Sequence, residues 1–235
     1  MSLLASNNAA RDAIMQSIRA NLAESERFSS VEHEADFAQM HRSAVADNGH
    51  AVGVDTSAVA MFRERAESVG AHCTVAQNEH EAGRALNEVI NDLRRSAKAN
   101  RIAVSDAPLL AELTRGITEL EICPSSSDLF DYDVGITSAQ RAIAETGTLI
   151  LESEQERHRL ISLLPPIHVA LVRSSDICLT IADALKQLRG DGQRAMSRAI
   201  TFITGPSRTA DIELTLTVGV HGPKELYVIV IDDAG

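Results

Sequence analysis

The chain has 235 residues, of which 44% are hydrophobic, enough to bury one principal core with a modest extension. Lys and Arg total 22 against 33 Asp and Glu, which gives a formal net charge of −11. This acidic balance argues against a broad nucleic-acid surface and against an electrostatic membrane anchor. A small anion is still compatible with it, because loop amides and helix N-termini bind anions locally whatever the net charge.

No apolar run approaches the roughly 20 residues that a membrane-spanning helix needs, and no signal peptide is recognisable. The sequence therefore predicts a soluble, cytoplasmic protein. Its three cysteines, Cys73, Cys123 and Cys178, lie far apart and form no CxxC pair. We expect them to be small core residues, and we expect no metal site or iron–sulfur cluster in this chain, because such clusters normally take about four thiolates.

The N-terminal part is expected to be separate from the main domain. Apolar residues recur near a 3.6-residue period over residues 1–24, which predicts an amphipathic helix. Residues 25–54 are rich in Ser, Glu, Asp, His and Gly and predict a linker. The main domain is expected to span residues 55–235.

Strand and helix patterns alternate along this domain. A helix with a candidate cap at Thr56 ends at Gly70, and Asn78 with Glu81 predicts the start of a second helix. Further strands are predicted at 101–105, 120–123, 134–137, 148–151, 167–172 and 199–204. Their nearly continuous apolar character is typical of parallel strands covered on both faces. The pattern predicts a mostly parallel, mixed α/β sheet with helices on both faces.

Two elements near the C-terminus receive more specific predictions. A helix is expected to start near Ser175 and to bury Ile177, Ile181, Leu185 and Leu188. Residues 214–218 and 226–231 are expected to pair as antiparallel strands across the connection at 219–224.

The loop from Gly205 to Asp211 is the strongest candidate for ligand binding. It follows a predicted strand, and ligands of open α/β sheets bind beyond the carboxyl ends of strands. Its amides, the hydroxyls of Ser207 and Thr209 and the guanidinium of Arg208 would suit a phosphate or a carboxylate. The alternative is a capped strand-to-helix turn with nothing bound.

A second candidate loop is Glu145 with the turn Thr146, Gly147 and Thr148. Gly147 permits a close backbone approach, and Glu145 is a candidate base, nucleophile or ligand anchor. The alternative for Glu145 is an ordinary solvent-facing turn residue.

The third candidate loop contains His221 and Gly222, where an imidazole lies between glycines. His221 is a candidate for proton chemistry, and the alternative is a structural or merely exposed histidine. No dinucleotide-binding GxGxxG, Walker loop or GxSxG motif occurs in the sequence.

Four strings in order resemble the LUD-domain family, the lactate-utilisation proteins of C type. They are Ala-Glu-Thr-Gly-Thr-Leu at 144–149, Leu-Leu-Pro-Pro-Ile-His at 163–168, Gly-Pro-Ser-Arg-Thr-Ala-Asp-Ile-Glu at 205–213 and Gly-Val-His-Gly-Pro at 219–223. The resemblance covers roughly residues 55–233. It implies a fold like that of the sugar-phosphate isomerase and coenzyme A transferase group.

The resemblance also implies a cytoplasmic bacterial role in the oxidation of L-lactate to pyruvate, alongside iron–sulfur partner proteins. Because this chain has no cluster-binding cysteine motif, an electron-carrying centre is expected in a partner. Some members of the wider fold group use a Glu covalently, which extends to Glu145 by analogy of fold. Two alternatives stay open: a free-standing enzyme that binds a sugar phosphate or coenzyme A thioester at the Gly-rich loops, and a non-catalytic scaffold. Whether the chain is itself catalytic, and whether it forms a homo-oligomer, stays open.

Overall fold

The computed structural model describes residues 15–17, 19, 54–153, 159–189, 197–210, 216–218 and 222–232. Residues 52–235 cluster as one compact unit, and the fold below is that of this unit. Residues 15–17 and 19 are helical, and the rest of the predicted N-terminal helix and of the linker up to residue 53 lies outside the described residues. None of the described helices is both long and apolar enough to cross a bilayer.

Within residues 52–235 the described helices are α3 (Val54–Ser68), α4 (Glu79–Arg95), α5 (Pro108–Leu113), α6 (Ile181–Arg189) and the short 3-10 helices η1 (Asp128–Asp131), η2 (Arg159–Ser162) and η3 (Ser174–Asp176). The described strands are β1 (His72–Ala76), β2 (Ile102–Val104), β3 (Leu120–Ile122), β4 (Val134–Ser138), β5 (Arg141–Ile143), β6 (Thr148–Glu152), β7 (Ile167–Arg173), β8 (Ile177–Cys178), β9 (Ile200–Ile203), β10 (Arg208–Ala210), β11 (Leu216–Val218) and β12 (Glu225–Ile231).

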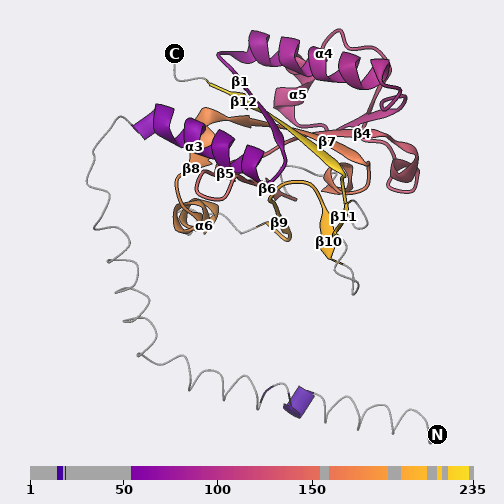
Figure 1. Cartoon of the computed structure of the whole chain (residues 1–235). Coiled ribbons are helices and arrows are strands. Elements are labelled where there is room, and N and C mark those ends of the chain that lie inside the picture. The colour runs from indigo at the N-terminus through magenta and orange to yellow at the C-terminus, as the bar shows by residue number, and fades with distance from the viewer. Residues whose placement is uncertain are drawn as a thin grey trace, which may run out of the picture. The chain divides into compact units, whose positions relative to one another are not determined.

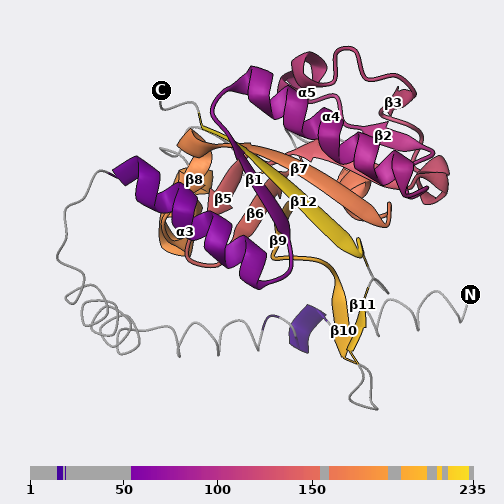
Figure 2. The ribbon, with the colours of Figure 1, turned by 45° about the horizontal axis from the view of Figure 1, so that its top comes forward.

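Six strands form a parallel sheet in the order β1-β12-β7-β4-β2-β3 (Figures 1 and 2). The central strands β7 and β12 pair over their full length, from Ile167 with Glu225 to Arg173 with Ile231. Both strands are buried along most of that length, because other layers cover both faces of the sheet. The mostly parallel α/β fold predicted from the apolar runs is therefore confirmed.

Helices α4 and α5 cover one face of this sheet (Figure 1). The predicted start of α4 is confirmed: the Asn78 side chain accepts the Glu81 amide at 2.9 Å, and the Glu81 carboxylate accepts the Gln77 amide at 3.0 Å. One stripe of α4 is buried against the sheet, namely Ala82, Leu86, Ile90 and Leu93. Burial of each large apolar side chain of this kind contributes roughly 1.5–3 kcal/mol.

The opposite face packs against α3 and a smaller sheet of order β8-β5-β6-β9. Leu149 and Leu151 of β6 pack with this side of the parallel sheet, whereas Ile150 packs with α6. Successive side chains of a strand point to opposite faces, so the three central residues of β6, Leu149, Ile150 and Leu151, are all apolar. The layers are thus α4 with α5, the parallel sheet, α3 with the small sheet, and α6 (Figures 1 and 2).

The expected C-terminal hairpin is wrong. Strand β12 lies in the middle of the parallel sheet between β1 and β7, whereas β11 pairs antiparallel with β10. β12 suits that position because its apolar residues alternate between two cores: Leu226, Val228 and Val230 face α3, and Ile229 and Ile231 face α4. A strand at the edge of a hairpin would not need both faces apolar.

Three further elements differ from expectation. β6 and β9 are antiparallel strands of the small sheet rather than strands of the parallel sheet, and β9 is only partly buried. α6 begins at Ile181, and the chain near Ser175 forms η3 and then β8. Ile181 and Leu185 are exposed, so the predicted buried face of this helix is wrong in those two positions. The buried residues of α6 are Ala184 and Leu188, because the helix starts later and turns a different face to β5.

One buried polar pair lies within the parallel sheet. His168 of β7 is fully buried, and its Nε2 lies 2.8 Å from the Thr137 hydroxyl of β4. Its Nδ1 is buried and has no hydrogen-bond partner among the described residues. Burial lowers the pKa of His168 to about 3, so the imidazole is neutral in the folded protein.

Candidate functional site

Two of the three candidate loops meet at the C-terminal end of α3, and the third contacts one of these two loops. Gly147 and Gly205 have positive φ angles of 64° and 76°, and both pack directly on this end of the helix. A Cβ at Gly147 would lie 2.3 Å from the Ala66 amide nitrogen, and a Cβ at Gly205 would lie 2.7 Å from the Val69 carbonyl oxygen. Both glycines are therefore required by the close approach of α3 as well as by their backbone conformation.

Hydroxyl groups connect two of these loops. The Thr148 hydroxyl lies 2.7 Å from the hydroxyls of both Thr146 and Thr204, which directly precedes Gly205. The third loop joins through the backbone, because the Ser207 amide donates to the Pro223 carbonyl at 2.8 Å. A Cβ at Gly222 would lie 3.2 Å from the Ser207 Cβ, so these two turns are also in close contact.

Arg208 is exposed and binds the end of the helix. Its Nη2 donates to the Val69 carbonyl at 2.9 Å. This contact satisfies one of the carbonyl groups that a helix leaves without an intrahelical partner at its C-terminus. The guanidinium therefore has a structural contact in addition to the anion-binding role predicted from the sequence.

Glu145 caps α6. Its Oε1 accepts the Ile181 amide at 2.7 Å, and its own amide donates to the Leu179 carbonyl at 3.1 Å. A carboxylate at a helix N-terminus is favourable, because it satisfies an orphan N–H and complements the helix dipole. The side chain remains exposed to solvent.

Two predicted site residues, His221 and Asp211, lie outside the described residues, so their predicted roles stay predictions. The backbone of Thr209 lies in β10, where it pairs with Thr217 of β11, and its side chain is outside the described set.

This loop cluster does not lie at the edge of the sheet where the sequence analysis placed it. The Gly205 loop follows β9 of the small sheet, not a strand of the parallel sheet. Its neighbours Gly70 and Pro223 lie two residues before the start of β1 and of β12. The Lys224 amide donates to the carbonyl of Pro166, which directly precedes β7, at 2.7 Å. The cluster therefore lies at the edge where parallel strands begin, so the carboxyl-end argument for it is wrong.

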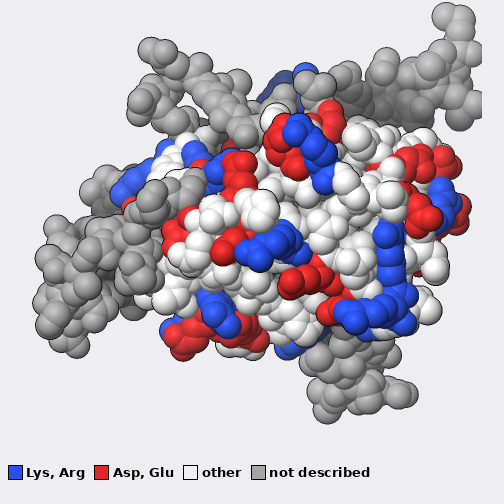
Figure 3. All heavy atoms as spheres, turned by 90° about the horizontal axis from the view of Figure 1, so that it is seen from above, with Lys and Arg blue, Asp and Glu red and all other residues white. Residues whose placement is uncertain are grey.

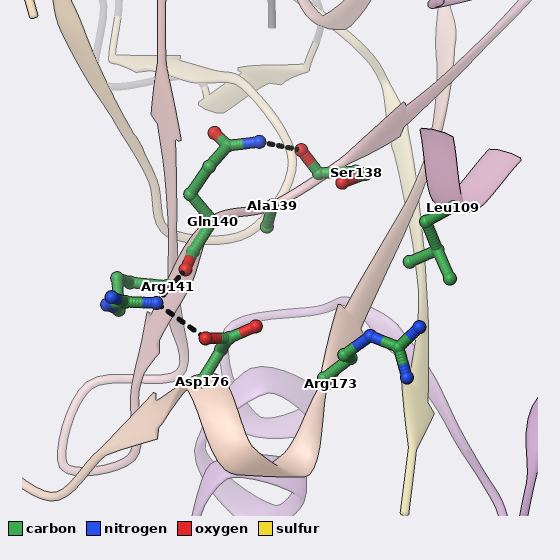
Figure 4. Close-up of a pocket in the computed structure, with 7 residues that line it drawn as sticks. All are labelled: Leu109, Ser138, Ala139, Gln140, Arg141, Arg173 and Asp176. Atoms are coloured by element: carbon green, nitrogen blue, oxygen red, sulfur yellow. Dashed lines mark hydrogen bonds and ion pairs between the residues drawn. The ribbon is translucent and has the colours of Figure 1, made fainter. Parts of the chain in front are cut away.

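The carboxyl ends of β4 and β7 carry a cavity of about 230 Å³. The order of the sheet reverses next to this cavity, between β4 and β2, because β2 leads outward to β3 while β4 leads to β7 on its other side. Open α/β sheets bind ligands at such reversals. The walls are Leu109, Ser138, Ala139, Gln140, Arg141, Arg173 and Asp176 (Figure 4).

Two ion pairs and a glutamine hold these walls. Arg141 pairs with Asp176 at 2.5 Å, and each side chain is about 30% exposed. Arg173 pairs with Glu79 of α4. The Gln140 side chain donates to the Ser138 carbonyl at 2.8 Å and accepts the Glu152 amide at 2.7 Å, which ties the cavity wall to β6.

Sequence reasoning missed this cavity. Its residues come from the ends of β4 and β7, the connection to β5, η3 and the first turn of α5. The sequence contained part of the information needed to find the cavity, since Ser138 and Arg173 are polar residues directly after predicted apolar strands. Only the sheet order brings these two ends side by side.

Positively and negatively charged side chains lie next to one another on the surface. Figure 3 shows Lys and Arg next to Asp and Glu over the face seen from above, without one large basic area. Several of these neighbours are ion pairs on single helices, such as Arg84 with Glu81. The face seen in Figure 3 thus carries no extended basic stripe of the kind that tracks a nucleic-acid backbone.

The three cysteines form no disulfide with one another and lie in different parts of the fold. Cys73 and Cys178 are buried in different apolar clusters, and burial raises the pKa of the Cys73 thiol to about 12. Cys123 directly follows β3 in the sequence and is half-buried. Within the described part of the chain, no three His, Cys, Asp or Glu side chains are grouped to hold a metal ion.

Comparisons with known proteins agree on one family. A family model described as the LUD domain matches residues 59–231. Lactate utilization protein C of Shouchella clausii is 42% identical over 104 residues, which is 43% of this chain and 44% of that protein. Its namesake in Bacillus licheniformis is 41% identical over 104 residues, 43% of each chain. The alignments thus span less than half the length of these relatives.

A solved structure shares the fold. The crystal structure of a DUF162 family protein from Deinococcus radiodurans superposes with a TM-score of 0.58 and 24% sequence identity. The match covers 77% of this chain and 99% of that chain. The likeness supports the α/β architecture described above.

Proposed function

Because this chain belongs to the LUD domain family, we propose that it acts in lactate utilisation, as a non-cluster subunit of a bacterial system that oxidises L-lactate to pyruvate. The observation that carries the proposal is the identity of about 40% to proteins named lactate utilization protein C, over a little more than 100 residues. Oxidation of lactate releases two electrons per molecule, so the system needs an acceptor.

The acceptor is assigned to partner proteins that carry iron–sulfur clusters. This assignment is supported by the chemistry of the cysteines, since two are buried among apolar side chains and the described residues contain no grouped ligand set. The chain then contributes binding and positioning rather than the redox centre.

Within this proposal the three-loop cluster handles the substrate or a partner at the end of α3. Arg208 pairs with a carboxylate, Ser207 and Thr209 hold its oxygens, and Glu145 or His221 transfers a proton. The support is spatial, because Thr148, Thr204 and Ser207 link the loops by hydrogen bonds. Arg208 would have to exchange its contact with Val69 for a ligand.

The proposal is tested by deleting the gene in a host strain that has no other lactate-oxidising enzyme. We expect loss of growth on L-lactate as sole carbon source and normal growth on pyruvate, with growth restored by a plasmid copy. Growth of the deletion strain on L-lactate at the parental rate would refute the proposal. Equal loss of growth on both carbon sources would also count against it, because the defect would not concern lactate.

A further inference from the structure

The parallel sheet ends in two edge strands, β3 and β1, and the edge at β3 is protected. β3 is three residues long with Glu121 at its centre. Glu119 and Cys123, which flank it, have positive φ angles of 63° and 50° that end the extended backbone. Short strands and charged side chains keep the edge of a sheet from pairing with another chain. A second copy is disfavoured here as well, because antiparallel pairing about the middle of β3 would place Glu121 opposite Glu121.

The edge at β1 lacks these protective features. β1 spans five residues, His72–Ala76, and contains no Lys, Arg, Asp, Glu or Pro. Figure 2 shows it between α3 and α4, and among the described strands only β12 pairs with it. An uncharged edge strand of this length is a template for the addition of another strand.

The backbone of β1 has hydrogen-bonding groups on its outer side. The Ala76 carbonyl accepts the amide of Asp232, which directly follows β12, at 2.7 Å, so Ala76 faces β12. The backbone groups of successive strand residues point to alternate sides, so Thr74 faces β12 as well. The N–H and C=O groups of Cys73 and Val75 therefore point outward, which offers two donors and two acceptors to another strand.

These outward groups match a second copy of the same strand. In an antiparallel pair centred on Thr74, Cys73 of each copy lies opposite Val75 of the other and exchanges both backbone hydrogen bonds with it. Thr74 then lies opposite itself in a non-hydrogen-bonded position, where side chains come closest and Thr–Thr pairs are favourable. The Thr74 side chain is exposed and hence available for that contact. Such a pair has two-fold symmetry, as the commonest homodimers do.

The position of α4 fits the same arrangement. α4 packs on both β1 and β12, so its axis lies roughly half a strand spacing inside β1. With strands about 4.8 Å apart, the two copies of α4 come to lie about 10 Å apart, a distance at which helices pack. A hollow of about 240 Å³ beside Thr74 is lined on the side of α4 by Glu81, Arg84 and Glu88. Each copy therefore presents both signs of charge to the other.

We propose that two copies of the chain associate through β1, in antiparallel register, with Thr74 on the two-fold axis. The two six-stranded sheets then form one continuous sheet across the dimer. The inference goes beyond the proposed function and does not depend on it, because it rests on the backbone and side chains of an edge strand alone.

The first test is sedimentation equilibrium of the full chain at about 1 to 100 μM. We expect a monomer–dimer equilibrium of the 25.3 kDa chain, with the dimer dominant at the highest concentration. Thr74→Lys should raise the dissociation constant roughly tenfold or more, because two ammonium groups meet on the axis. Thr118→Lys, the same change at an exposed residue next to the β3 edge, should leave the dissociation constant unchanged.

The second test reports the register of the two strands. A non-hydrogen-bonded antiparallel pair brings the Cα atoms to about 4.5 Å, within the range of a disulfide bond. Thr74→Cys should therefore give a covalent dimer on oxidation with diamide, seen on a non-reducing gel. Thr118→Cys and the parent chain, treated in the same way, should give no comparable covalent dimer.

Three results would each overturn the inference. They are a parent chain that stays monomeric at about 100 μM, a dimer that Thr74→Lys leaves intact, and a Thr74→Cys variant that crosslinks no more than Thr118→Cys. Because the Thr74 side chain is exposed, we expect its variants to melt at the temperature of the parent. Crosslinking of Thr74→Cys decides the matter if Thr74→Lys does not fold.

Discussion

The buried imidazole of His168 makes a quantitative prediction about acid stability. Its pKa is lowered from an ordinary 6.5 to about 3 by burial, so the folded protein keeps it neutral while the unfolded chain protonates it below about 6.5. The unfolded state then binds the extra proton, and the free energy of unfolding falls as the pH falls from about 6.5 to about 3. The slope approaches about 1.4 kcal/mol per pH unit, which gives a loss of about 3 kcal/mol between pH 7 and pH 4.

Carboxylates also titrate in this range, so the assay compares variants. His168→Gln keeps a polar atom near the Thr137 hydroxyl and cannot take up a proton; exposed His80→Gln is the control. Urea unfolding followed by circular dichroism at pH 7, 6, 5 and 4 should show that His168→Gln loses about 3 kcal/mol less than the parent, while His80→Gln tracks the parent. Parallel curves for the parent and His168→Gln would refute the argument. An NMR titration of the parent imidazole gives the same answer if the variant does not fold.

Two further predictions concern the loop cluster. Gly147→Ala should lower the free energy of unfolding by about 2 kcal/mol or more beyond the control variant Gly116→Ala. Both glycines have a positive φ, but only at Gly147 does the backbone of α3 occupy the space of a Cβ. Equal melting temperatures of the two variants would contradict this. Glu145→Ala should cost about 1 kcal/mol in urea unfolding through the lost cap on Ile181, and Glu145→Gln should cost less because its amide oxygen still accepts; a neutral Glu145→Ala would remove the capping role.

Local features of this fold were predictable from the sequence. The start of α4 at Asn78 and Glu81 follows from side-chain groups that satisfy nearby backbone amides, and such contacts need no knowledge of the rest of the chain. The strands around Val134 and Val169 were likewise visible, because double burial requires unbroken apolar runs. The family resemblance, carried by the loop strings, was confirmed over residues 59–231.

The order of the strands was not predictable in the same way. The run at 226–231 is equally compatible with an edge hairpin and with a central parallel strand, because pairing partners far away in the sequence decide between them. The exposed face of α6 was missed for a related reason. Ile181 and Leu185 lie four residues apart, as core residues of a helix do, yet the helix packs through Ala184 and Leu188.

The loop cluster and the cavity at the ends of β4 and β7 differ in the contacts that their residues make. In the loop cluster, the glycine positions are filled by the backbone of α3, Arg208 holds Val69, and Glu145 holds Ile181. These motif residues therefore have structural contacts in addition to the ligand roles proposed for them. The cavity at the ends of β4 and β7 is built differently: no motif marks Arg173, which lines it from the end of β7 and pairs with Glu79 of α4. The loops that identify the family and the carboxyl edge of the parallel sheet, where open α/β sheets bind ligands, are therefore separate places in this fold.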